Sequence, residues 1–260
     1  MRTFGEIQRA VDVAREAVAA GGAAALAWWR KDPPAEVKAD TSPVSQADRE
    51  SDAAILGVLR AAFPDHDVLS EESGARGPGF CDCRWIIDPL DGTRGFLRGD
   101  PTWGPLVALE YQGRLVAAAM SMPALGETWC AGRGRGCFKD GERVRVSRIA
   151  DWGEARIVVG EMDRLLIGPH GAAVLALIES APSTRCPGDL ASCAVLLDGR
   201  AEVWLEAGVR EWDLAAPHLL VEEAGGRFTD FLGRPSHATG QAVGSNRVLH
   251  EKVLSALRRV

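Results

Sequence analysis

Two long helices are predicted at the start of the chain. Residues 4–30 form one amphipathic segment, and a second helix is expected over residues 46–62. Ser45 stands at the N-cap position of the second helix, with Asp48 three residues further on. The polar, proline-containing stretch 31–42 between the helices predicts a loop. The apolar face of the first helix is formed by Ile7, Val11, Ala14, Val18 and Ala25.

Short apolar runs separated by turn signals follow the two helices. Gln112-Gly113 and Asp140-Gly141 mark turns between the later runs, so the sheet that they form is expected to be mostly antiparallel. The predicted strands cover residues 68–70, 84–87, 106–110, 115–120, 127–131 and 144–146.

Strands and helices alternate in the second half of the chain. This change of pattern predicts an N-terminal α+β domain over residues 1–148 and a C-terminal α/β domain over residues 149–260. Strands are expected over residues 157–159, 201–205 and 226–229. Helices are expected over residues 170–180, 191–197, 214–224 and 248–258.

Charge and composition narrow the classes of function. The 260 residues suffice for one large or two modest domains, and the formal net charge of −6, with a pI of about 5.5, does not favour broad binding to nucleic acid or to an anionic membrane. The start of the chain lacks the basic-then-apolar layout of a signal peptide. The Ala-rich run 17–29 is too short for a membrane span. A cytoplasmic location is therefore expected.

The six cysteines are expected to be reduced, partly buried thiols. A chain of this length has little need of disulfide bonds. Cys81 and Cys83 are one residue apart, which is not the usual spacing of a zinc-binding pair.

The strongest chemical signal is the segment Asp88-Pro89-Leu90-Asp91-Gly92-Thr93. Pro89 disfavours helical backbone at Asp88, so the apolar strand before it should stay extended as far as this carboxylate. Two carboxylates and a backbone carbonyl within four residues suit a hard divalent cation. After Gly92 the chain can begin a helix, whose free N–H groups favour an anion. The segment therefore predicts metal-assisted phosphoryl chemistry.

Three other carboxylates are candidates for the same site, and each also has a purely structural interpretation. Asp48 is either a solvated helix carboxylate or a site residue. Glu71 belongs either to a charged loop or to the site. Asp213 is either the N-cap of the helix predicted after it or a metal ligand.

Together, these segments resemble the inositol monophosphatase family of metal-dependent phosphatases. The run from Trp85 to Thr93 matches the family pattern Trp-Ile-Ile-Asp-Pro-Ile/Leu-Asp-Gly-Thr, and Trp212-Asp213-Leu214-Ala215 with Gly225-Gly226 matches its C-terminal pattern. The resemblance covers essentially the whole chain. It implies a layered α+β and α/β sandwich of the inositol monophosphatase and fructose-1,6-bisphosphatase type, with the active site at the domain interface. It also implies a homodimer and inhibition by lithium.

The resemblance also implies the role of each site residue. Phosphate would bind the amides of Gly92 and Thr93. Thr93, polarised by Asp48, and Glu71 would orient or deprotonate the attacking water, with no covalent intermediate. The substituent of the ester would contact Glu206. Two or three Mg²⁺ ions would be held by Glu71, Asp88, the carbonyl of Leu90, Asp91 and Asp213.

The variable positions are more similar to the histidinol-phosphatase branch of the family than to its inositol-specific branch. A carboxylate at Asp189 near Glu206 would favour a cationic substrate such as histidinol phosphate, although Asp189 could instead cap the helix after it. Two positions depart from this branch: Glu211-Trp212 has the form of the broader family, and Leu190-Ala191-Ser192 stands where the branch is often Tyr-rich. The positions that carry the branch resemblance are Arg94, Trp103, Asp189, Glu206 and Arg210.

Three functions remain as alternatives. The first is a Mg²⁺-dependent histidinol-phosphate phosphatase of histidine biosynthesis. The second is a monophosphatase for inositol, sugar, polyol or amino-alcohol phosphates. The third is a non-enzymatic regulatory binding protein, against which the complete set of ligands argues. The expected partner is a small phosphorylated substrate, with neither nucleic acid nor a membrane among the partners.

Overall fold

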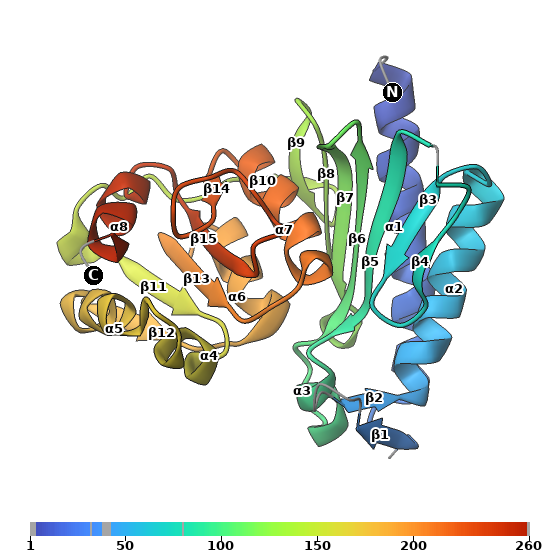
Figure 1. The fold of residues 1–260 in the computed structure, drawn as a ribbon, viewed down its shortest axis with the longest axis horizontal. Coiled ribbons are helices and arrows are strands. Elements are labelled where there is room, and N and C mark those ends of the chain that lie inside the picture. The colour runs from blue at the N-terminus through green and yellow to red at the C-terminus, as the bar shows by residue number, and fades with distance from the viewer. Residues whose placement is uncertain (1–3, 32, 38–42, 80, 259–260) are drawn as a thin grey trace.

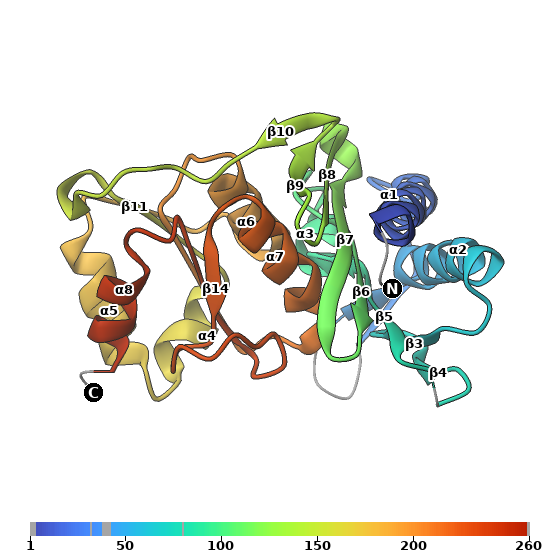
Figure 2. The same ribbon diagram turned by 90° about the horizontal axis from the view of Figure 1, so that it is seen from above.

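Helices and sheets stack in alternating layers (Figures 1 and 2). The structure is a computed structural model that describes residues 4–31, 33–37, 43–79 and 81–258. The outermost helices on one side, α1 (Phe4–Leu26) and α2 (Gln46–Ala62), pack on each other and cover one face of a large sheet. This arrangement confirms the predicted layered fold class.

The large sheet has the strand order β10-β9-β8-β7-β6-β5-β3-β4. Its neighbouring strands are antiparallel, except for the parallel pair of β3 and β5. The strands are β3 (Asp67–Ser70), β4 (Gly74–Arg76), β5 (Cys83–Asp91), β6 (Gly104–Tyr111), β7 (Arg114–Met122), β8 (Glu127–Gly132), β9 (Gly136–Lys139) and β10 (Glu142–Val144).

The smaller sheet has the order β12-β11-β13-β15-β14. In this sheet β11 runs parallel to β12 and β13, whereas β15 is antiparallel to β13 and β14. Its strands are β11 (Arg156–Val159), β12 (Ser183–Arg185), β13 (Val203–Ala207), β14 (Arg227–Thr229) and β15 (Gln241–Ser245).

Further helices lie on both sides of the smaller sheet. Between the two sheets lie α6 (Asp189–Leu197) and α7 (Glu211–Glu223), and Figure 1 shows α7 beside the large sheet. On the outer face lie α5 (Gly171–Ser180) and α8 (His250–Leu257), and α4 (Met162–Ile167) connects β11 to α5. The fold also contains the short α-helix α3 (Thr93–Arg98) and two single-turn 3-10 helices, η1 (Pro123–Leu125) and η2 (Trp152–Glu154).

Several predicted boundaries were wrong. The first helix ends at Leu26 instead of residue 30, because the N–H of Trp28 donates to Ala25 in a tighter turn. The predicted strand 144–146 is β10 and ends at Val144, because the N–H of Val146 turns away to the carbonyl of Ala224. The sequence patterns also did not indicate α4 or the strands β4, β9, β12 and β15.

The predicted loop 31–42 contains part of a small hairpin. β1 (Ala35–Val37) pairs antiparallel with β2 (Pro43–Ser45), where the sequence predicted no strand. Residues 32 and 38–42 of this stretch lie outside the described residues. The hairpin brings the chain to Ser45, the first capping residue of α2.

The predicted start of α2 is confirmed. The N–H of Ala47 donates to Ser45 Oγ, while the N–H and hydroxyl of Ser45 donate to Asp48 Oδ2 at 2.7 and 2.6 Å. These reciprocal hydrogen bonds give partners to backbone N–H groups at the start of the helix, which have none within the helix itself. It also fixes the buried Asp48 carboxylate, which is 2% exposed, in one orientation.

Helix α7 is buried because it packs against both sheets. Its residues contact β5, β6 and β7 on one side and β14 and β15 on the other. Its buried side chains belong to an apolar cluster that includes Leu106 of the large sheet and Ala242 of the smaller one. Among the described residues, no helix is both long and apolar enough to cross a lipid bilayer.

Leu219→Ala tests whether α7 holds the two sheets together. Leu219 is fully buried, so the substitution is expected to lower the free energy of unfolding by about 2–5 kcal/mol. Leu232→Ala is the matched control, because Leu232 is 52% exposed, and its effect should stay within about 0.5 kcal/mol. Urea unfolding followed by circular dichroism measures both. An equal effect of the two substitutions would contradict the central role of α7.

Candidate active site

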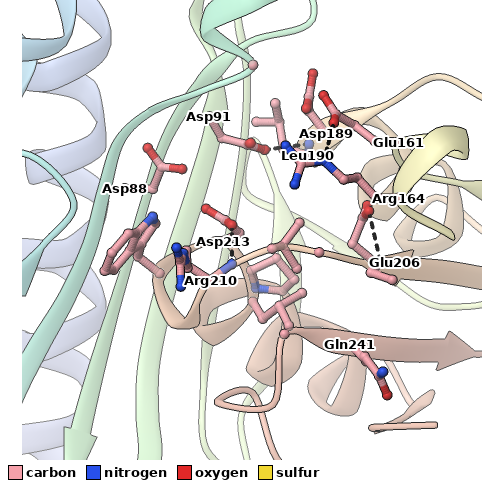
Figure 3. A pocket seen from close by; sticks show the side chains of 18 of the residues that line it. Asp88, Asp91, Glu161, Arg164, Asp189, Leu190, Glu206, Arg210, Asp213 and Gln241 are labelled. Atoms are coloured by element: carbon pink, nitrogen blue, oxygen red, sulfur yellow. Dashed lines mark hydrogen bonds and ion pairs between the residues drawn. The ribbon is translucent and has the colours of Figure 1, made fainter. Parts of the chain in front are cut away.

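A cavity of about 650 Å³ opens where the end of β5 faces the starts of α6 and α7 (Figure 3). Its lining joins segments that are far apart in the sequence. The charged and polar lining residues include Glu71, Asp88, Asp91, Thr93, Arg94, Glu161, Arg164, Asp189, Glu206, Arg210, Asp213 and Gln241.

The end of β5 supplies the first two carboxylates. The pairing of β5 with β6 shifts between Asp88 and Asp91, so Pro89 and Leu90 leave the regular ladder. Ser51 Oγ donates to the carbonyl of Pro89 at 2.6 Å, and the N–H of Leu90 donates to Asp88 Oδ1 at 2.9 Å. The irregular segment is therefore held from both sides, and it carries two carboxylates within four residues.

Glu71 and Asp213 lie beside Asp88. One ligand atom from each of these three residues lies within 4.8 Å of the others. Glu71 follows β3, and its N–H donates to the carbonyl of Ile87 in the parallel neighbour β5. Carboxylates from three segments that are far apart in the sequence therefore lie close together, as expected from the sequence.

Asp213 is not an N-cap, which excludes one of its two sequence interpretations. Helix α7 begins at Glu211, three residues earlier than predicted, and Arg210 is its N-cap residue. Asp213 therefore lies in the first turn, where the N–H of Arg210 donates to its Oδ2 at 2.6 Å. This bond fixes one oxygen of the carboxylate near Asp88 and Glu71.

The electrostatics of the cluster fit a divalent cation. Burial raises the pKa of Asp88 and of Asp91 well above the usual range, and neighbouring carboxylates raise it further. Burial likewise raises the pKa of Asp213 to about 7. Such a group of acids ionises together only when positive charge is brought among them. Oxygen ligands alone suit a hard ion such as Mg²⁺.

The turn after β5 places Thr93 between this cluster and Asp48. Gly92 has a φ of 86°, and a side chain there would press against the carbonyl oxygen of Thr102 at 3.1 Å, so glycine is required. Thr93 Oγ1 lies 3.0 Å from Asp48 Oδ1 and 3.0 Å from the carbonyl oxygen of Leu90. The Thr93 hydroxyl can therefore pass a proton to a buried carboxylate.

Further carboxylates line the side of the cavity formed by the smaller sheet. Glu206 is 4% exposed, and burial raises its pKa to about 8. Burial and the charge of Glu161 raise the pKa of Asp189 to about 6. Figure 3 shows Glu161, Asp189 and Glu206 around one part of the cavity.

Asp189 does not cap α6, contrary to the alternative interpretation of the sequence. The N-cap residue is Gly188, which has no side chain, and Asp189 begins the helix with a φ of 41°. Its Oδ2 would lie 3.3 Å from a side chain placed on Gly92. The N–H of the following Leu190 donates to Asp91 Oδ2 at 2.6 Å. The start of α6 thus joins the smaller sheet's side of the cavity to the carboxylate cluster.

Glu161 was missed by the sequence analysis. It belongs to none of the recognised motifs, but it lies two residues after the end of β11, which runs parallel to β13. Because the carboxyl ends of parallel strands lie at the same edge, Glu161 is placed near Glu206. This strand order is a property of the fold, so no local signal in the sequence indicated Glu161.

Gly160 makes room for Glu206. A side chain on Gly160 would overlap the carboxylate of Glu206. The N–H of Gly160 donates to the carbonyl of Leu205 at 3.0 Å, so the two backbones cannot simply separate. Glycine at this position is therefore a condition for the acidic side of the cavity.

The predicted basic and aromatic residues divide into two groups. Arg94 and Arg210 line the cavity and are exposed. Arg164, which the sequence did not indicate, also lines the cavity and forms an ion pair with Glu161 at 3.7 Å. Trp103 was expected to influence the substrate, but it is fully buried and packs edge-on against Phe96, with ring centroids 4.7 Å apart. Trp103 belongs to the apolar cluster that also contains Phe96 of α3, and it does not line the cavity.

An ionic group ties the start of α7 to the large sheet. Arg84 of β5 contacts Glu211 at 2.5 Å and Glu110 at 3.4 Å. His237 lies 3.5 Å from Glu211 and 3.6 Å from Glu110. The guanidinium occupies the place that a cation would take between these two carboxylates, so the group positions α7 and its Asp213 instead of binding a metal.

The layered fold and this site place the protein in the class of metal-dependent phosphatases. A model of the inositol monophosphatase family matches residues 6–260, so the chain belongs to that family. The resemblance inferred from the sequence is confirmed.

Similar proteins carry several names. The chain is 38% identical over 221 residues to the histidinol-phosphatase of Chlorobaculum parvum, which covers 85% of each chain. It is 36% identical over 221 residues to the inositol-1-monophosphatase of Mesorhizobium japonicum, with 83% of each chain covered. The crystal structure of the extragenic suppressor protein SuhB from Bartonella henselae is 30% identical and superposes with a TM-score of 0.86, over 98% of this chain and 99% of that one.

The buried Glu206 should make the metal-free protein less stable as the pH rises. Its pKa is raised from 4.5 to about 8, so the folded state keeps a proton that the unfolded state has released. The stabilising contribution is fully present below about pH 4.5 and is lost as the pH rises through about 8. Glu206→Gln removes this titration. The difference in Tm, wild type minus variant, should therefore fall across this interval in metal-free buffer, and a constant difference would contradict the assignment.

Proposed function

We propose that this protein is a Mg²⁺-dependent phosphate monoester hydrolase whose substrate is histidinol phosphate. The observation that carries the choice of substrate is the second group of carboxylates, Glu161, Asp189 and Glu206, on the side of the cavity formed by the smaller sheet. Membership of a phosphatase family supports the reaction class. The 38% identical relative named histidinol-phosphatase supports the particular ester.

The residues that would hold Mg²⁺ are Glu71, Asp88, the carbonyl of Leu90, Asp91 and Asp213. Three of them already bring ligand atoms within 4.8 Å of one another. When bound there, Mg²⁺ would neutralise the phosphate oxygens and make a bound water more acidic. The carboxylates contribute by keeping the ions in place, since each of Asp88, Asp91 and Asp213 accepts one backbone N–H bond that fixes its orientation.

Thr93 and Asp48 would handle the proton of the attacking water. Asp48 Oδ2 accepts two bonds from Ser45, which leaves Oδ1 to face the Thr93 hydroxyl at 3.0 Å. The hydroxyl can accept a proton from water while it donates its own to Asp48. Burial raises the pKa of Asp48 and so makes it a better proton acceptor. The amides of Gly92 and Thr93, at the start of α3, would bind the phosphate.

The alcohol part of the ester would lie against the second group of carboxylates. Histidinol carries an amine and an imidazole, both of which can be cationic, and a cation placed near Asp189 and Glu206 favours their ionised forms. Inositol carries neither group and would add no positive charge beside Asp189 and Glu206 beyond that of Arg94, which already lowers the pKa of Asp189. A broader monophosphatase for polyol phosphates is the second candidate, because a 36% identical relative is named inositol-1-monophosphatase.

The reaction is tested by phosphate release with Mg²⁺ from histidinol phosphate, inositol 1-phosphate and a panel of sugar phosphates. Histidinol phosphate is expected to have the highest kcat/KM. Asp88→Asn should lower kcat at least about 10³-fold, because it removes a central ligand of the cluster. Circular dichroism and thermal unfolding check that the variant is folded. Equal turnover of all esters would contradict the proposed substrate. An active Asp88→Asn variant would contradict the proposed metal site.

Asp189→Asn is expected to reduce the preference for the cationic ester. The change keeps the size of the side chain and removes its charge, so kcat/KM for histidinol phosphate should fall about 10-fold or more, while that for inositol 1-phosphate changes little or rises. Asp163→Asn is the matched control, since Asp163 is exposed on α4 and is not part of the cavity lining. The same loss for both esters would mean that Asp189 acts on the phosphate side of the cavity.

A further inference from the structure

Three soft donor side chains meet at the opposite end of β5 from the active site. Ligand atoms of His66, Cys81 and Cys83 all lie within 4.8 Å of one another. Cys83 is the first residue of β5, and Asp88 follows five residues later in the same strand. At about 3.3 Å per residue, the two places are about 17 Å apart. This group of donors is separate from the carboxylate cluster in both position and chemistry.

The backbone brings the three side chains together. His66 directly precedes β3, which pairs in parallel with β5 so that Asp67 lies opposite Arg84. The same register places His66 next to Cys83. The N–H of Cys83 donates to Cys81 Sγ at 3.3 Å, which turns the Cys81 side chain back toward the start of the strand. The site therefore depends on strand pairing, and the single residue between the cysteines does not prevent their convergence.

The histidine is fixed in position and keeps a ring nitrogen available. Its ring stacks on Phe63, with centroids 4.5 Å apart at an interplanar angle of 18°, and lies 6.3 Å from the ring of Trp85. Its Nδ1 is buried and has no hydrogen-bond partner among the described residues. A buried ring nitrogen without a partner is unusual, because burying an unsatisfied polar atom is unfavourable.

We propose that His66, Cys81 and Cys83 form a zinc site. Two thiols would release their protons, each sulfur would give an electron pair to Zn²⁺, and the neutral imidazole would give a third. Zinc bonds of 2.0–2.3 Å set tetrahedral ligands roughly 3.5–4 Å apart, so the present spacing needs only a small contraction. The fourth position opens toward solvent, since His66 and Cys81 are only partly buried.

The surroundings of the three donors favour the binding of a soft cation. Asp65, Asp67 and Asp82 are neighbours of the three donors in the sequence and add negative charge. Nitrogen and sulfur ligands select zinc, whereas the carboxylates around Asp88 select Mg²⁺.

The test uses Co²⁺ as a spectroscopic probe on the reduced full-length protein, with excess Mg²⁺ to occupy the carboxylate site. A thiolate-to-cobalt charge-transfer band in the near ultraviolet is expected at one equivalent of Co²⁺, and Zn²⁺ should abolish it. The Cys81→Ser, Cys83→Ser double variant should lose the band. His66→Phe keeps an aromatic ring beside Phe63 and should weaken Co²⁺ binding at least about 10-fold, since one ligand is lost.

Cys186→Ser and Cys130→Ser are the controls, because these free cysteines lie outside the group of donors. Both should keep the full band. Absence of the band in the wild type, its persistence in the double variant or its loss in Cys186→Ser would each overturn the zinc site. Mg²⁺-dependent phosphate release by the double variant shows that it is folded, and the cobalt spectrum does not depend on whether the proposed substrate is correct.

Discussion

Repulsion among buried carboxylates is the constraint on which the rest of this structure depends. Asp88, Asp91 and Asp213 meet in a place where burial alone opposes their charged forms. Each accepts one backbone N–H bond, from Leu90, Leu190 and Arg210 respectively, and these bonds fix the orientation of the acids without balancing their charge. A bound cation would balance this charge. Binding the ion and stabilising the folded site are therefore coupled processes.

The donors of these bonds come from different layers of the fold. Leu90 belongs to the large sheet, whereas Leu190 and Arg210 lie at the starts of α6 and α7. The carboxylates are thus correctly placed only when the helices between the sheets have docked. The contact between Arg84 and Glu211 strengthens this dependence, because it joins β5 directly to the first turn of α7. Catalytic geometry here depends on tertiary packing more than on any single loop.

Local signals in the sequence predicted much of the structure. The capping pair Ser45 and Asp48 gave the start of α2 correctly, because capping is decided by neighbours in the chain. The start of α7 was missed by three residues, since Asp213 fits an N-cap and a first-turn position equally well until Arg84 and Glu211 are seen together. Glu161 could not be found, because its role arises from the parallel order of two strands far apart in the sequence. The segment from Asp88 to Thr93 was recognisable because its residues are contiguous.

The contact between Gly160 and Glu206 also constrains how such a site can change over evolutionary time. While Glu206 is present, Gly160 cannot accept any side chain without a collision. Replacing Glu206 by a small residue first would remove this restriction and free position 160 to vary. A side chain at position 160 is therefore easier to accommodate after Glu206 has become smaller than before. Gly160 thus contributes to the acidic side of the cavity by leaving space for Glu206, although the glycine itself has no side chain with which to contact a substrate.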